Sequence, residues 1–248
     1  MPCLLLMNKG LVKTVNFKNP GYVGDPINAV KIFNEKEVDE LVFLDITASQ
    51  EGRIPDVKVI NEIATECFMP LCYGGGVTTL ESMKQIFGIG VEKVSLNTAA
   101  VENPELITEG ASVFGSQSII VSMDVKKNFW GKYEVYYKRG TKSTGEHPVN
   151  FAKKMEQLGA GEILVTSIDK EGTWDGYDTD LLKMITSAVK IPVIANGGAG
   201  TISHLADGVN KGGASAVAMG SMTVYQKKGL GVLINFPSRK DLDKIFTV

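Results

Sequence analysis

The sequence predicts a closed (β/α)8 TIM barrel made of two fused half-barrels, and three observations support this fold class. Eight short apolar runs alternate with helical patterns along the 248 residues. The runs are almost wholly hydrophobic, as expected for parallel strands that are covered on both faces. The chain also repeats itself at a fixed offset. Eight βα units in a chain of this length favour a barrel, with an open doubly wound sheet as the alternative.

The predicted strands are runs of β-branched and other apolar residues that end in polar residues or glycine. They span residues 3–7, 40–46, 69–75, 93–99, 118–125, 162–169, 191–198 and 216–221. The clearest helical patterns place apolar residues at i, i+3, i+4 and i+7. They span residues 25–38, 79–90, 148–160 and 179–190. Asp25 and Thr179 stand at or near helix starts, where short polar side chains are favoured.

An internal repeat indicates how the barrel is assembled. A shift of 122 residues superimposes matching positions in the two halves: Glu40 on Glu162, Ile46 on Ile168, Ile63 on Ile185, Pro70 on Pro192, and Gly75–Gly76 on Gly197–Gly198. Each half would contain four βα units, and half a barrel cannot close its own sheet. We therefore expect residues 1–248 to form a single domain.

The composition excludes several classes of function. A net charge of -2 and a pI near 5.8 do not favour binding to nucleic acid or to an anionic membrane. No apolar run reaches membrane-spanning length. Three cysteines and two histidines have neither disulfide-framework nor metal-site spacing. We expect a cytoplasmic protein without a metal site, a cofactor, a nucleic-acid partner or a membrane partner.

One insertion interrupts the alternation of strands and helices. Residues 126–148 contain the alternating segment YEVYYK between glycines, a pattern that predicts a hairpin. The loops that follow the strands form the active face of this fold, so the hairpin could cover the barrel mouth as a lid. A surface loop without a function is the alternative.

Glycine pairs after the third and seventh strands predict two phosphate sites. The segments YGGGVTT and NGGAGTIS place glycines between a strand end and a helix start, where free backbone N–H groups can meet an anion. The next strand of each half ends in LNTAA or GSMT, which adds hydroxyl groups. Two such sites across one mouth suit a long molecule with a phosphate at each end.

Longer segments identify a family resemblance. DELVFLDITAS, VSLNTAAVENPELIT, FGSQSIIVSMD, GAGEILVTSID with EGTWDGYD, and IANGGAG resemble HisF, the cyclase subunit of imidazole glycerol phosphate synthase. The resemblance covers nearly the whole chain. It implies a barrel that takes ammonia from a HisH-type glutaminase at its N-terminal face and conducts it through the interior. In the family, ammonia then attacks a bis-phosphorylated ribulosyl aminoimidazole carboxamide.

The resemblance also implies roles for individual residues. The first phosphate site would use Gly76, Asn97 and Thr98, and the second Gly172, Gly198, Gly220 and Ser221. The charged ammonia gate at the barrel base would consist of Glu40, Lys93 and Glu162. Lys13 and Asp45 stand where the family keeps polar residues near the mouth, although ordinary loop residues are the alternative.

One departure from the family bears directly on catalysis. The family's cyclase uses two aspartates as acid and base, one ending the first strand and one ending the fifth. Asp124 supplies the second, but the first position is Leu5, which cannot transfer a proton. Glu171, where the family usually has aspartate, is a milder change, and the C-terminal tail also departs from the family pattern.

With these departures, the chain resembles a paralogous branch of the family called HisF2 or AglZ-like. The segments that show this resemblance are PCLLLMNKGLVKTVNF and ECFMPLCYGGG. That branch implies a conduit that pairs with a HisH-type glutaminase and delivers ammonia to a sugar-amidinating synthetase at the other face. The product would belong to a surface polysaccharide, such as lipopolysaccharide O-antigen, or to a flagellar glycan. The alternative is a true cyclase of histidine biosynthesis in which another acid, such as Asp45, replaces Leu5. A non-catalytic scaffold and a related phosphosugar isomerase are further alternatives.

Overall fold

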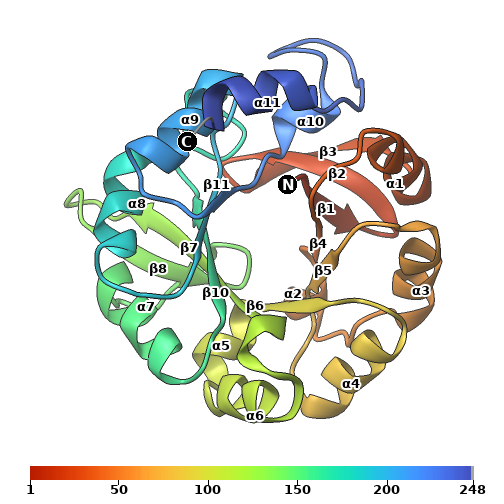
Figure 1. Ribbon diagram of the computed structural model, residues 1–248. Coiled ribbons are helices and arrows are strands. Elements are labelled where there is room, and N and C mark those ends of the chain that lie inside the picture. The colour runs from red at the N-terminus through yellow and green to blue at the C-terminus, as the bar shows by residue number, and fades with distance from the viewer. Residues whose placement is uncertain (247–248) are drawn as a thin grey trace.

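The computed structural model describes residues 1–246 and has the barrel architecture that the sequence predicts (Figure 1). Its eight parallel strands are β1 (Cys3–Met7), β4 (Leu41–Asp45), β5 (Leu71–Gly74), β6 (Lys93–Leu96), β7 (Ile119–Lys127), β10 (Glu162–Ser167), β11 (Val193–Asn196) and β12 (Ala216–Val217). A parallel bridge between Pro2 and Met219 joins the last strand to the first and closes the sheet. Residues 247–248 of the predicted domain lie outside the described residues.

Helices surround the sheet and bury an apolar stripe against it (Figure 1). They are α1 (Pro26–Glu35), α2 (Ala48–Glu51), α3 (Val57–Glu66), α4 (Leu80–Gly88), α5 (Thr98–Glu102), α6 (Glu105–Phe114), α7 (Pro148–Gln157), α8 (Thr179–Thr186), α9 (Ile202–Asn210), α10 (Ser221–Val224) and α11 (Arg239–Phe246), with one 3-10 turn, Ser116–Ser118. Asp25 caps α1, as predicted, and accepts from the Asn28 N–H at 3.0 Å. No helix within residues 1–246 is long and apolar enough to span a bilayer.

The 122-residue repeat is visible in the way equivalent helices begin. Thr79 caps α4 and Thr201 caps α9, both with extended backbones and both accepting from the N–H three residues on. Asp56 and Asp178 cap α3 and α8 with nearly the same backbone angles, φ -78° with ψ 87° and 84°. Equivalent positions therefore share local structure as well as sequence, as expected for fused half-barrels.

Two apolar regions stabilise the barrel. The larger lies between the sheet and the helices, and it buries Phe33, Phe43 and Phe151 almost completely. The smaller fills the barrel interior and consists of Cys3, Val42, Cys72, Ile120, Leu164, Ile194 and Ala218. Burial raises the pKa of the Cys72 thiol well above its usual value, so this interior is a poor environment for charge.

A hairpin that was not predicted from the sequence follows β1. Strands β2 (Gly10–Val15) and β3 (Lys18–Gly24) pair antiparallel and extend the sheet beyond β1. Their turn, Asn16–Phe17, has positive φ at both residues, the geometry that twists correctly between hairpin strands. Glycine usually supplies that geometry, and its absence from the turn hid the hairpin in the sequence.

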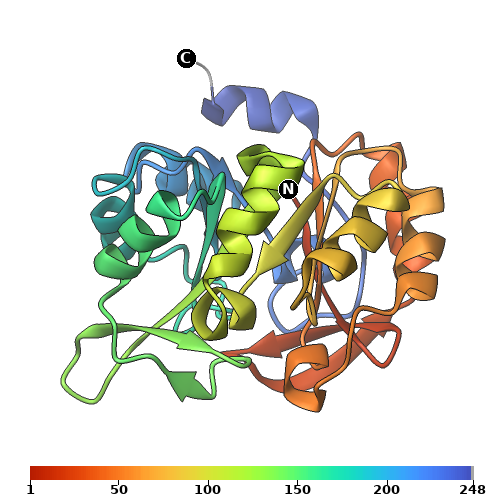
Figure 2. The ribbon, with the colours of Figure 1, turned by 90° about the horizontal axis from the view of Figure 1, so that it is seen from below.

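The hairpin predicted within residues 126–148 is confirmed. It is formed by the end of β7 with β8 (Tyr133–Tyr137) and β9 (Lys142–Ser143). Figure 2 shows this hairpin and the β2–β3 hairpin at one end of the barrel, with α11 at the opposite end. The end with the hairpins is where the parallel strands terminate, so it is the barrel mouth.

Candidate functional site

One cavity, of about 130 Å³, occupies the mouth at the carboxyl ends of the parallel strands. All the residues predicted for the two phosphate sites and the catalytic centre line it: Leu5, Lys13, Asp45, Gly76, Asn97, Thr98, Asp124, Gly172, Gly198, Gly220 and Ser221. These residues come from segments far apart in the sequence. The structure therefore brings the predicted mouth residues together, and their roles remain predictions.

Close backbone packing explains one glycine in each phosphate site. Gly76 has a φ of 71°, and a Cβ there would lie 2.5 Å from the Arg53 carbonyl oxygen. Gly198 has a φ of 109°, and a Cβ there would lie 2.1 Å from the Gly176 carbonyl oxygen. Both positions require glycine for the fold itself, so the glycine pairs alone do not establish phosphate binding.

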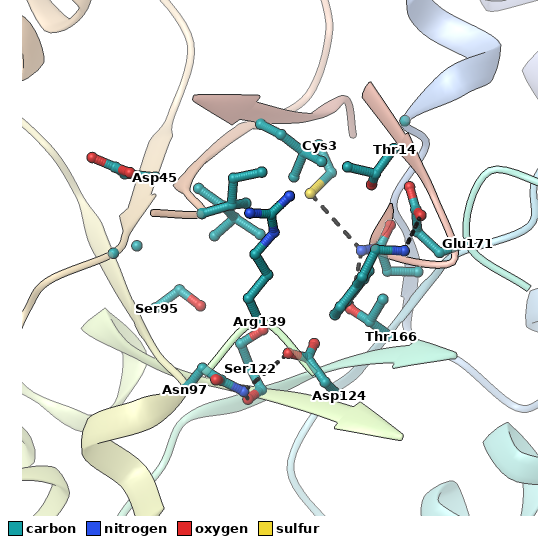
Figure 3. A pocket seen from close by; sticks show the side chains of 18 of the residues that line it. Cys3, Thr14, Asp45, Ser95, Asn97, Ser122, Asp124, Arg139, Thr166 and Glu171 are labelled. Atoms are coloured by element: carbon teal, nitrogen blue, oxygen red, sulfur yellow. Dashed lines mark hydrogen bonds between the residues drawn. The ribbon is translucent and has the colours of Figure 1, made fainter. Parts of the chain in front are cut away.

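Asp124 lines the cavity from β7, and Leu5 lines it from β1 on the opposite side of the barrel. Asp124 Oδ2 accepts a hydrogen bond from Asn97 Nδ2 at 3.2 Å (Figure 3). Burial is the main reason that the pKa of Asp124 is raised to about 8, and the negative charge of Glu171 is the second. A hydrogen bond with Thr166 lowers this pKa but does not offset the rise. At neutral pH this carboxyl is mostly protonated and can donate, but no carboxylate faces it from position 5.

Lys13 and Glu171 form a buried ion pair beside the second phosphate site. The Lys13 Nζ lies 3.5 Å from Glu171 Oε1, and both side chains are less than a tenth exposed. Glu171 Oε2 accepts from the Phe17 N–H at 3.1 Å, which ties the β2–β3 turn to the loop after β10. Removing one partner of such a pair would leave a buried charge uncompensated.

Asp45 lines the cavity, but its carboxylate already has several partners. Oδ1 accepts from the N–H groups of Thr47 at 3.0 Å and Ala48 at 3.1 Å, at the start of α2. Oδ2 lies 3.3 Å from Arg53 Nη1. These contacts hold Asp45 in place as a structural carboxylate.

Several cavity residues were not predicted from the sequence. Thr14 Oγ1 and Ser95 Oγ are buried side-chain oxygens without a hydrogen-bond partner among the described residues. Arg139, from the turn between β8 and β9, reaches across the mouth (Figure 3). Thr14 was missed because it lies on β2, and the hairpin that contains this strand was not predicted.

The predicted gate residues come together at the opposite end of the barrel. Lys93 Nζ lies 3.0 Å from Glu40 Oε2 and 2.9 Å from Glu162 Oε1. Burial raises the pKa of Glu40 even though Lys93 opposes that shift. Burial works against the charge of Lys93, but hydrogen bonds to Glu162 and Glu40 outweigh it and raise the Lys93 pKa. The ion pairs form a charged layer beneath the apolar interior.

Comparisons with known proteins decide the family. Residues 1–229 match the family model described as histidine biosynthesis protein. A Pseudomonas aeruginosa protein with the provisional name imidazole glycerol phosphate synthase subunit hisF2 is 51% identical over 243 residues, covering 98% of this chain and 97% of that protein. The chain belongs to the HisF family of histidine biosynthesis proteins.

Other members of the HisF family show similar coverage. A Vibrio vulnificus protein provisionally named subunit hisF3 is 48% identical over 245 residues, covering 98% of this chain and 94% of that protein. The imidazole glycerol phosphate synthase subunit HisF of Alkaliphilus metalliredigens is 45% identical over 227 residues, covering 92% of this chain and 90% of that protein. The chain is thus similar both to proteins named as HisF paralogues and to a protein named HisF outright.

Proposed function

We propose that this HisF-family chain is the ammonia-conducting subunit of a glutamine-dependent amidotransferase and has given up cyclase chemistry. The observation that carries the proposal is Leu5 across the barrel from Asp124, in a mouth where the other predicted residues are present. General acid–base help contributes about 10²- to 10⁴-fold per group. Loss of one member of a cooperating pair would therefore remove most of the cyclase rate.

The barrel interior supports the conduit role. A layer of Glu40, Lys93 and Glu162 at the base is followed by an apolar interior that contains Cys72 and Val42, and then by the mouth cavity. Neutral ammonia can cross an apolar layer at modest cost, whereas ammonium would lose its hydration. The charged layer would strip water and admit ammonia, and the apolar layer would keep the molecule unprotonated.

The two ends of the barrel imply two partners. A HisH-type glutaminase would dock at the N-terminal face, beside the charged layer. A synthetase that forms an amidino group on a sugar would receive ammonia at the mouth, as the resemblance to the HisF2 branch implies. Its product would enter a surface polysaccharide or glycan, and both proteins would work in the cytoplasm.

The second candidate is the cyclase of imidazole glycerol phosphate synthase. The similarity to a protein named HisF and the presence of Asp124 in the mouth favour it. The cyclase reaction would require another acid in place of the aspartate that is missing at position 5. The sequence suggests Asp45 for that role. The contacts of Asp45 with Thr47, Ala48 and Arg53 argue against that replacement.

Coupling to a glutaminase tests the conduit proposal directly. The purified chain is mixed with a HisH-type glutaminase. Gel filtration then measures complex formation, and an assay of glutamine hydrolysis measures the glutaminase rate. We expect a complex and a faster hydrolysis than that of the glutaminase alone. A Lys132→Gln variant is the control for docking at the N-terminal face, because Lys132 lies on the hairpin at the opposite end of the barrel. It should form the complex and stimulate hydrolysis as the unmodified chain does. Absence of both complex and stimulation would contradict the proposal.

A further inference from the structure

The side chain of Arg139 lies in the mouth cavity without a partner. It projects from the turn between β8 and β9 into the space between the strand ends (Figure 3). Among residues 1–246 it has neither a hydrogen bond nor an ion pair. The other cations near the cavity are paired, Lys13 with Glu171 and Arg53 with Asp45. Among the described residues that line the cavity, Arg139 is therefore the cation without a partner.

The turn that carries Arg139 is fastened over the first phosphate site. The neighbouring Lys138 forms an ion pair of 2.6 Å with Glu102, the last residue of the short helix that begins at Thr98. The Lys138 carbonyl also accepts from Gln50 Nε2 of α2 at 3.3 Å. These contacts hold the hairpin on the side of the mouth where Gly76, Asn97 and Thr98 lie.

The cavity below Arg139 contains a polar group that lacks a partner. Ser95 on β6 is 3% exposed, and its Oγ has no hydrogen-bond partner among the described residues. Ser95 lines the same cavity as Arg139 and is drawn with it in Figure 3. A buried hydroxyl without a partner costs free energy, which a ligand oxygen at this position would recover. The observation points to a ligand rich in oxygen.

We propose that Arg139 is a ligand-binding residue on the side of the first phosphate site and that it binds the phosphate of a phosphorylated sugar. A guanidinium presents a planar fork of N–H donors that matches two phosphate oxygens, and such charge-assisted pairs are stronger than neutral hydrogen bonds. The mouth would thus select a dianionic ligand over its uncharged analogue. This role concerns binding and requires neither ammonia transfer nor cyclase activity.

Titration calorimetry with ribose 5-phosphate tests the proposal on the isolated full chain. We expect Arg139→Gln to raise the dissociation constant by about 10- to 100-fold, because hydrogen bonds to charged groups contribute about 1.5–3 kcal/mol. Arg139→Lys should retain part of the affinity. Lys142→Gln is the matched control, since it removes the same charge from the exposed part of the same hairpin, outside the cavity. It should change the dissociation constant less than twofold.

A direct spectroscopic readout separates binding from a structural effect. In protein labelled with ¹⁵N-arginine, the Nε–Hε signal of Arg139, assigned from the Arg139→Gln variant, should shift on addition of ribose 5-phosphate. It should not shift on addition of ribose. Equal affinities of Arg139→Gln and Lys142→Gln, or an unshifted Arg139 signal at saturation, would overturn the proposal. Undetectable binding of ribose 5-phosphate to the unmodified chain would also overturn it, while leaving the conduit proposal unaffected.

Discussion

The protonation of Asp124 should make the stability of the protein depend on pH. Its carboxyl is buried, and its pKa rises from 3.8 to about 8 on folding, chiefly because burial disfavours the charged form. A group whose pKa is higher in the folded state contributes stability below its unfolded pKa and loses it as the pH rises through the folded pKa. The window is therefore about pH 4 to 8. At about 1.4 kcal/mol per pH unit, the loss is on the order of 5 kcal/mol.

Asp124→Asn should remove this dependence, because an amide has nearly the same shape and does not ionise. Urea unfolding of both proteins between pH 5 and pH 8.5 measures it. The free energy of unfolding of the unmodified chain should fall, relative to that of Asp124→Asn, by several kcal/mol across this range. Asp175→Asn, which changes an exposed carboxylate, is the control and should track the unmodified chain. Parallel curves for Asp124→Asn and the unmodified chain would refute the reasoning.

Two further predictions test the packing at the mouth and the charged layer at the opposite end of the barrel. Gly198→Ala should lower the free energy of unfolding by about 2–4 kcal/mol, because its Cβ would lie 2.1 Å from the Gly176 carbonyl oxygen at a φ of 109°; an unchanged thermal midpoint would contradict that contact. Lys93→Met should lower the free energy of unfolding by about 3 kcal/mol, the low end for a buried pair because Lys93 is 20% exposed, by leaving Glu40 and Glu162 without their cation. Adding Glu40→Gln should recover part of that loss in urea unfolding, and no recovery would contradict the pairing.

Much of the fold was predictable because local and global signals agree. The apolar runs became the eight parallel strands, and Asp25 caps α1 as predicted from the sequence. The repeat also predicted which residues would share the mouth, since equivalent strand ends must meet at one end of a barrel. Gly76 and Gly198 show what the sequence could not predict. Their place at the mouth was predicted correctly, but the close backbone contacts that require glycine at both positions are visible only in the structure.

The missed features depend on contacts between distant segments. Asn16, in the turn of the unpredicted hairpin, donates from its side chain to the carbonyls of Ile168 and Asp169 at 2.9 and 3.0 Å. Such a partner cannot be identified from the residues next to the turn. Arg139 was missed for a similar reason, because its direction follows from the ion pair that Lys138 forms with Glu102.

Cyclase turnover by the unmodified chain tests the central claim most directly. The ribulosyl substrate of imidazole glycerol phosphate synthase is supplied with an ammonium salt, so that no glutaminase is needed, and product formation is measured for the unmodified chain, Leu5→Asp and Leu5→Asn. Because Leu5 cannot transfer a proton, we expect no turnover at a normal enzyme rate from the unmodified chain or from Leu5→Asn, and a gain in Leu5→Asp of about 10²-fold or more. Turnover by the unmodified chain at about 1 per second or faster, a typical enzyme rate, would contradict the claim that this barrel has given up the cyclase reaction.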